Sequence, residues 1–354
     1  MIKTLSRESL DTFLWLIKHG VHFQDKVYQI YGSIYPRCHK PILPRGTAYV
    51  QALSEACLAN GVLIRTSTKL TQLIKSEDGV IVGAEIQSEG KSKNVRTKKG
   101  VVLAAGGFGA NKAMIEKYAP RLKTQYTDSA PGSTGEVLEM AKSVGAQLVN
   151  MEIVEVVPEG TRDIGLSARI YMLVKGVAFV NAEGKRFVDE RASRSEIAKA
   201  LRNQETEHCF TIADNENVQS LDKMQLKNLY RSLFDGQVWK ADTIEELASQ
   251  TDIPVDNLKH SISQIPEKVR PKSAPFWAVK IYPWIHYTLG GIKINEMAEC
   301  LDSQDHPIEG LFAAGQITGN VHGENRLGGN GLTDAIVFGR IAGRNIAKRL
   351  STYD

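Results

Sequence analysis

Residues 321–343 read VHGENRLGGNGLTDAIVFGRIAG, and this stretch indicates the fold more strongly than any other in the chain. It begins as a glycine-rich loop and continues with the apolar spacing of an amphipathic helix over about 332–350. The first turn of such a helix has free N–H groups and the positive end of the helix dipole, which suit an anion or an electron-rich ring. A capped amphipathic helix accounts for Leu332 and Ile336, but it does not account for NRLGG (325–329) just ahead of it.

Two further stretches combine an apolar strand with glycines: VVLAAGGFG (101–109) and GLFAAGQITG (310–319). In each, a buried strand ends where glycine permits a positive φ or a close approach of the backbone to a ligand. A plain tight turn explains either stretch alone. The occurrence of both in one chain predicts a parallel sheet that binds a cofactor at the carboxyl ends of its strands.

The regions outside these glycine-rich stretches differ in the secondary structure that their patterns predict. Before residue 156 the pattern predicts helices at 6–19 and 47–59 and short strands that include 62–65. Residues 177–188 predict a hairpin that turns at Glu183-Gly184, and helical, charged segments follow it. The glycines return after His286. The chain therefore predicts one discontinuous α/β domain interrupted by a second domain.

Composition excludes several classes of protein. A net charge of +4, with 42% hydrophobic and 24% charged residues, is ordinary for a globular protein and too slight to indicate nucleic-acid binding. No apolar run is long enough to span a membrane, and the charged N-terminus does not resemble a signal peptide. Four scattered cysteines exclude a zinc ribbon or a disulfide scaffold. We therefore expect a cytoplasmic protein with neither a nucleic-acid partner nor a membrane span.

The motifs taken together resemble one family. The 321–343 stretch is similar to the C-terminal flavin-binding motif of the soluble fumarate reductase/flavocytochrome c family, whose FAD-dependent members include fumarate, urocanate and acrylate-type reductases. YPRCHKP (35–41) and VVLAAGGFG resemble the flavin domain of that family. EGKRFVDERASR (183–194) and HYTLGG (286–291) resemble its capping domain and return strand.

The resemblance implies a fold class: α/β with an α+β cap, in which an incomplete glutathione-reductase-like FAD domain is interrupted by a capping domain. It implies the first part of the FAD-binding domain at 1–157, the cap at 158–289 and the remainder of the FAD-binding domain at 290–354. The family opens with a strand–GxGxxG–helix unit for the ADP half of FAD, and no GxGxxG occurs in this sequence. We therefore expect a chain truncated at its N-terminus.

Site residues follow from the resemblance position by position. Arg194 falls where the family keeps a proton-donating arginine, and His286 and Arg326 fall where it binds a substrate carboxylate. Gly329 and Arg169 are the other substrate-binding positions. The positions expected to contact FAD are Gly106, Gly107, Glu136, Tyr287, Gln316, Gly331 and Leu332.

The implied reaction reduces, or in reverse forms, a C=C bond next to a carboxylate. Hydride from flavin N5 reaches the β carbon and Arg194 protonates the α carbon. A guanidinium is a poor acid, so this transfer depends on a strongly basic carbanion and a held geometry. The implied partners are a small unsaturated carboxylic acid, an electron donor that the sequence does not identify, and a chain that supplies the ADP-binding unit. No metal ligands are expected.

Four positions depart from the family pattern. The proton-relay glutamate and arginine fall on Ile170 and Leu173, and a substrate histidine falls on Val157, none of which transfers protons. These apolar residues favour a mono-acid with an apolar remainder over the dicarboxylate fumarate. Gln316 replaces a glutamate that hydrogen-bonds the ribityl chain, which removes a charge-assisted contact.

Three interpretations remain open at this point. The first is an FAD-dependent oxidoreductase of the fumarate-reductase type. The second is a truncated or split, catalytically inactive relic of the family that needs another chain to bind FAD. The third is a flavin-free protein that binds a small acid through Arg326. Individually, Arg194 could be a surface ion-pair partner and His286 a structural histidine.

Overall fold

The parallel pairing of β6 (Val101–Leu103) with β16 (Pro307–Ala313) joins the two glycine-rich parts of the chain. The computed structural model describes residues 1–30, 33, 35–43, 46–122, 126–160, 168–170, 175–206 and 208–351. β15 (Glu299–Leu301) completes a sheet in the order β15-β16-β6. Since β6 and β16 are parallel, the glycine turns that follow them lie at the same edge of this sheet.

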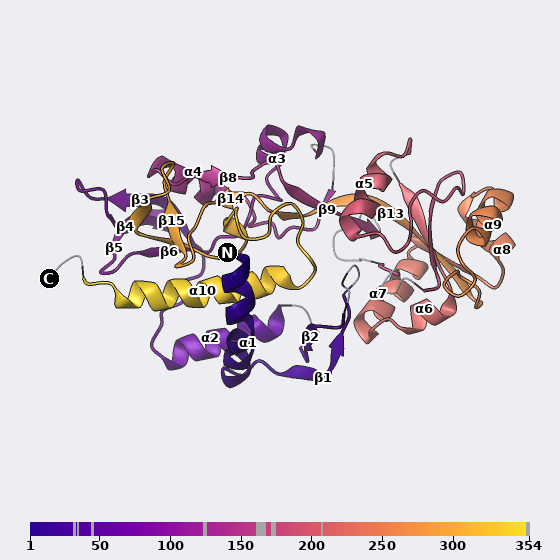
Figure 1. Ribbon diagram of the computed structural model, residues 1–354, viewed down its shortest axis with the longest axis horizontal. Helices are drawn as coiled ribbons and strands as arrows, with labels where there is room; N and C mark the ends of the chain where they lie inside the picture. The colour runs from indigo at the N-terminus through magenta and orange to yellow at the C-terminus, as the bar shows by residue number, and fades with distance from the viewer. Residues whose placement is uncertain are drawn as a thin grey trace.

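Helix α10 (Asn330–Lys348) packs along this sheet and is crossed by α1 (Ile2–Lys18) (Figure 1). Its inner face contributes Val337, Phe338 and Ile341 to the largest apolar core. The elements around this core are β3 (Thr68–Lys75), β4 (Ile81–Ser88), β5 (Lys91–Arg96), α3 (Lys112–Tyr118), the 3-10 turn η1 (Pro120–Leu122), α4 (Glu136–Ser143), β8 (Leu148–Val149), β14 (Gly291–Ile292) and the 3-10 turn η2 (Gly315–Ile317).

Strand β13 (Phe276–Thr288) organises the other half of the molecule and points back toward the glycine-rich half (Figure 1). Its first part pairs with β11 (Cys209–Ala213) and β12 (Val238–Ala241), and its last part pairs with β9 (Val154–Gly160). The remaining elements here are β7 (Tyr126–Thr127), β10 (Val177–Asn181), α5 (Arg194–Arg202), α6 (Asn215–Gln219), α7 (Lys223–Phe234), α8 (Ile244–Thr251) and α9 (Val255–Ser263).

The expected α/β core with an α+β insertion is confirmed. The domain boundaries at 157/158 and 289/290 stay a prediction. The first of them falls inside β9 and the second directly after β13, which are the two strands that pair with each other. Leu173 lies outside the described residues. Ile170 is fully buried beside Trp277 and Val279 in the core of the insertion, and its expected place near the substrate stays a prediction.

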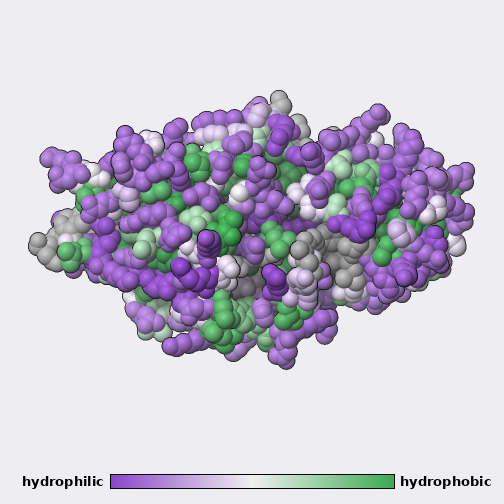
Figure 2. All heavy atoms as spheres, in the orientation of Figure 1, coloured by the Kyte–Doolittle hydropathy of each residue, from purple (hydrophilic) through white to green (hydrophobic). Residues whose placement is uncertain are grey.

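Helix α2 (Thr47–Ala59) has the predicted bounds but a different buried face. The sequence pattern favours Val50 as a core residue, and it is 68% exposed. The side chains that pack inward, against Leu16 and Val21, are the small Ala48 and Ala52. Apolar side chains are correspondingly visible over α1 and α2 in Figure 2.

The predicted strand at 62–65 does not form. Val62, Leu63 and Ile64 are exposed and lie in an irregular segment after α2. The hairpin with β1 (Phe23–Tyr28) and β2 (Cys38–Pro41) lies on the opposite side of α2 (Figure 1). An apolar run specifies a strand only where a neighbouring strand pairs with it, and the described residues contain no such neighbour for this run.

Burial divides the four cysteines into two classes, which predicts their reactivity. Cys209 and Cys300 are fully buried, and burial raises the pKa of Cys209 to about 12, so both thiols stay protonated and shielded. Cys38 and Cys57 are partly exposed. We expect two of the four thiols to react quickly with Ellman's reagent at pH 8 in the native protein, and all four in denaturant. A third fast native thiol would contradict this burial.

Candidate active site

Arg194 is the first residue of α5, and a capping box holds it in place. The Ser193 hydroxyl accepts a hydrogen bond from the Glu196 N–H at 3.3 Å, and the Glu196 carboxylate accepts one from the Ser193 N–H at 2.7 Å. These bonds satisfy N–H groups that the helix itself leaves unpaired. Because α5 packs against β9, the start of the helix brings the Arg194 side chain to that strand.

Arg326 comes from the glycine-rich loop that precedes α10, and it is buried. Its guanidinium carbon lies 4.4 Å from the centre of the Tyr287 ring on β13. A Cβ added at Gly331 would lie 3.1 Å from Tyr287 Cε2 and 3.5 Å from Arg326 Cδ, so a side chain there would require a small shift of the Tyr287 ring. The loop before α10 thus places the Arg326 guanidinium against the Tyr287 ring at the end of β13.

Glu155 on β9 joins the two arginines. Its Oε1 lies 3.5 Å from Arg194 Nη2, and its Oε2 lies 2.9 Å from Arg326 Nη2. The Oε2 contact is an ion pair without hydrogen-bond alignment. The side chains of Glu155, Arg326 and Arg194 are 3%, 5% and 13% exposed, respectively. The two arginines that the sequence predicts as site residues therefore meet in one buried cluster, which we call the arginine pair.

Sequence reasoning missed Glu155, although a signal was present. Residues 153–160 read IVEVVPEG, an apolar strand interrupted by two acids. A carboxylate buried in such a strand requires a cation nearby. The second acid, Glu159, is paired with Arg169. Arg169 is therefore bound to its own carboxylate and does not join the arginine pair.

His286 has a different partner. Its Nδ1 lies 2.7 Å from Asp128 Oδ2, another carboxylate that the sequence analysis did not single out. Both side chains are partly exposed, and the contacts described for His286 do not include either member of the arginine pair. Gly329 begins α10 with φ of 86°, and a Cβ there would lie 3.4 Å from the Cys38 sulfur.

The predicted FAD-contacting glycines lie at the shared edge of β6 and β16. Gly106 has φ of 79°, a conformation that favours glycine. A Cβ added at Gly107 would lie 2.1 Å from Thr288 Oγ1 and 3.0 Å from the Gln316 amide. The turn after β6, the turn after β16 and the end of β13 therefore converge, and Tyr287 and Gly331 adjoin them.

Other predicted cofactor positions are more exposed. Leu332, on the first turn of α10, is 49% exposed. Glu136, at the start of α4, forms a 2.7 Å ion pair with Lys69. Tyr287 itself is partly buried, and this burial together with the nearby Asp334 carboxylate raises the pKa of its phenol well above the ordinary range. Tyr287 therefore stays neutral at physiological pH.

Two features of this arrangement fit a flavin. Helix α10 begins at Gly329 without a side-chain cap, although the Asn330 and Leu332 N–H groups already donate to the Leu327 and Gly329 carbonyls at 3.2 Å. Arg326 Nε is buried with no hydrogen-bond partner among the described residues. Such donors suit an electron-rich ring or an anion. The described residues contain no group of His, Cys, Asp and Glu able to hold a metal ion.

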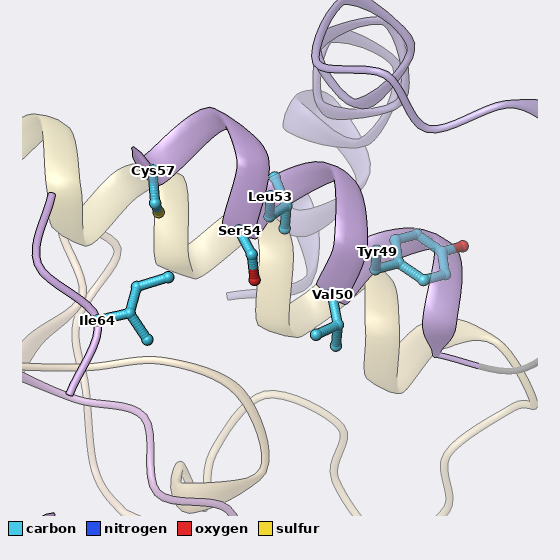
Figure 3. A pocket seen from close by; sticks show the side chains of 6 residues that line it. All are labelled: Tyr49, Val50, Leu53, Ser54, Cys57 and Ile64. Carbon is cyan, nitrogen blue, oxygen red and sulfur yellow. The ribbon is translucent and has the colours of Figure 1, made fainter. Parts of the chain in front are cut away.

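A separate hollow of about 300 Å³ lies on the outer face of α2 and does not involve these residues. It is lined by Tyr49, Val50, Leu53, Ser54, Cys57 and Ile64, whose side chains point to one side of the helix in Figure 3. Its lining is almost wholly apolar. It lacks the cationic groups that a carboxylate requires, so we assign the chemistry to the arginine pair.

Cofactor-type glycine turns at the carboxyl ends of parallel strands, with one arginine from an inserted part and one from the loop before α10, define a dinucleotide-binding α/β protein with a cap. The chain belongs to the FAD binding domain family, whose model matches residues 1–332. FAD is therefore its cofactor, and the resemblance to the fumarate reductase/flavocytochrome c proteins is confirmed.

Three similar proteins specify this assignment. The NADH:acrylate oxidoreductase of Vibrio harveyi is 34% identical over 98% of this chain and 36% of its own length. A probable fumarate reductase of Shewanella frigidimarina is 33% identical over 98% of this chain and 61% of its own length. The open conformation of a flavocytochrome c3 fumarate reductase superposes with a TM-score of 0.79 at 32% identity, covering 98% of this chain and 64% of that one. The chain thus spans between one third and two thirds of these proteins.

The capping box predicts a measurable effect on α5. Replacing Ser193 by alanine removes one capping bond and should lower the free energy of unfolding by about 1 kcal/mol. Denaturant unfolding of the variant measures this loss. Replacing Ser92 by alanine is the matched control, because Ser92 is exposed on β5 and lies outside the box. An equal loss in both variants would contradict the role of the cap.

Proposed function

We propose that this chain is an FAD-dependent oxidoreductase that saturates, or in reverse forms, a C=C bond next to a carboxylate. The observation that supports this most is the convergence of Arg194 and Arg326 beside Tyr287 and the start of α10. The names of the similar proteins, which include acrylate and fumarate oxidoreductases, support the substrate class. When bound, FAD exchanges a hydride with the β carbon of the substrate.

Arg326 is proposed to bind the substrate carboxylate. Its Nε is buried without a partner among the described residues, while its Nη1 already donates to the Leu327 carbonyl at 3.3 Å. A carboxylate oxygen would satisfy the unpaired Nε with a charge-assisted bond. The same contact draws negative charge toward the carboxylate as the enolate develops, which lowers the barrier.

Arg194 is proposed to hold and transfer the proton. Hydride addition at the β carbon leaves an electron pair at the α carbon, and a proton from the Arg194 guanidinium completes the new C–H bond. The net change is two electrons and one proton added with the hydride and one further proton from Arg194. The capping box and Glu155 restrict the guanidinium to one region, which replaces a bimolecular encounter.

We propose supporting roles for the other site residues that the sequence predicts. His286, Gly329 and Arg169 are proposed to border the substrate. The FAD contacts are proposed to come from Gly106, Gly107, Glu136, Tyr287, Gln316, Gly331 and Leu332. An electron donor, a chain that supplies the ADP-binding unit and a cytoplasmic location stay predictions. No helix among the described residues is both long and apolar enough to cross a bilayer.

The test is a reduction assay on the purified chain supplied with FAD. We expect the protein to retain the yellow cofactor after gel filtration and to oxidise reduced methyl viologen when acrylate or fumarate is added. The saturated acid should form with two dye molecules oxidised per molecule. Propionate, which has no C=C bond, is the control. A chain that neither retains FAD nor oxidises the dye would contradict the proposal.

A further inference from the structure

We propose that Glu155 makes this site selective for monocarboxylates by cancelling one of the two positive charges of the arginine pair. The inference rests on the proposed function and goes beyond it, since it names the substrate charge and the residue that sets it. In their ordinary ionised forms, Arg194 and Arg326 contribute two positive charges and Glu155 contributes one negative charge. The cluster therefore offers one uncompensated positive charge to a ligand.

The geometry shows that Glu155 acts on both arginines at once. One carboxylate oxygen faces Arg194 at 3.5 Å, and the other faces Arg326 at 2.9 Å. Because only 3% of the Glu155 side chain is exposed, water does not screen the negative charge of its carboxylate. Every substrate oxygen bound by these guanidiniums therefore lies close to a fixed negative charge.

Among the described residues, the two other predicted substrate-binding groups that can carry a positive charge already have carboxylate partners. Arg169 is paired with the buried carboxylate of Glu159, and His286 is paired with Asp128 at 2.7 Å. On β9, Glu155 and Glu159 are four residues apart and lie on the same face of the strand, as alternation requires. Glu159 thus compensates the charge of Arg169, and Asp128 is the partner of His286.

The strand face between the two glutamates is apolar. Val157 is fully buried and pairs across the strands with Trp284, which is also buried. A second substrate carboxylate directed along this face would be desolvated without a cation to compensate it. A monocarboxylate with an apolar or neutral remainder brings one negative charge, which matches the one uncompensated positive charge of the arginine pair.

The test compares binding of propionate with binding of succinate, by calorimetry on the FAD-loaded protein. We expect the wild-type protein to bind propionate more tightly. Glu155→Gln keeps the shape and removes the charge, so it should raise the affinity for succinate relative to propionate by about 10- to 100-fold. Glu155→Asp keeps the charge and should keep the wild-type ratio. Glu152→Gln is the matched control, because Glu152 is exposed three residues away.

Each outcome decides the inference. A wild-type protein that binds succinate as well as propionate, or that binds neither, overturns it without any variant. An unchanged ratio in Glu155→Gln also overturns it, and equal shifts in Glu155→Gln and Glu155→Asp would indicate a purely structural role and overturn it too. If the ratio shifts as expected but acrylate and fumarate are not reduced, charge selection stands and the proposed reaction fails. Turnover with acrylate against fumarate should follow the same ratio as binding.

Discussion

Replacing Arg194 by glutamine should lower the rate of acrylate reduction by about 10²- to 10⁴-fold, the range typical of a positioned general acid. Glutamine cannot supply the proton that the α carbon needs. FAD content should not change, because Arg194 pairs with Glu155 and lies beside Gly328, and neither residue is among the proposed FAD contacts. Steady-state kinetics with reduced methyl viologen measures the loss. It should appear in kcat more than in KM, since Arg326 remains to bind the substrate carboxylate.

The control for this prediction lies three residues upstream. Arg191 is paired with Asp189 and is 75% exposed, so Arg191→Gln makes the same chemical change outside the arginine pair. We expect this variant to keep its activity within about twofold. A loss of less than tenfold in Arg194→Gln, or an equal loss in both variants, would show that Arg194 is not the proton donor.

Replacing Arg326 by methionine should have the largest effect on stability and should also abolish acid binding. It removes the nearer of the two cations from a carboxylate that is 3% exposed. Breaking a buried ion pair from one side costs about 3–5 kcal/mol, because the remaining charge stays buried. Arg194, at 3.5 Å, compensates part of this cost, so we expect about 3 kcal/mol in denaturant unfolding.

A double variant separates stability from binding. Arg326→Met combined with Glu155→Gln removes the stranded charge, so most of the lost stability should return while propionate binding stays absent. Arg344→Met is the control, since its pair with Glu8 is exposed and worth about 1 kcal/mol or less. If the double variant were no more stable than the single one, Glu155 and Arg326 would not form an energetically coupled pair.

Much of the fold could be predicted because its signals are local. The strand-to-glycine junctions at 101–109 and 310–319, and the loop-to-helix transition at 321–343, depend on backbone conformations that only a few residue types adopt. The helix at 47–59 was predicted with its exact bounds. Its buried face was not, because burial depends on which element packs beside the helix. Val50 is apolar yet exposed, and the small Ala52 packs inward.

The residues of the candidate site also fall into those that the sequence could identify and those that it could not. Arg194 and Arg326 could be singled out, since each lies in a motif with a recognisable neighbourhood. Their carboxylate partners could not, because Glu155 is far from both in sequence and an acid within a strand has no local pattern that names its cation. Asp128 is likewise 158 residues from His286. Ile170, expected near the substrate from its position in the chain, belongs to the core of the insertion.

The sequence by itself determined a discontinuous, glycine-rich α/β domain, because glycine turns and helix starts depend on consecutive residues, and the resemblance of these motifs to a known family implied a flavoprotein with a cap. Only the tertiary structure decided the charge of the site. Coulomb interactions depend on distance in space and on exclusion of water, and chain neighbours specify neither. Because β9, α5 and the loop before α10 pack together, Glu155 lies between Arg194 and Arg326. The arginine pair therefore keeps a single uncompensated positive charge.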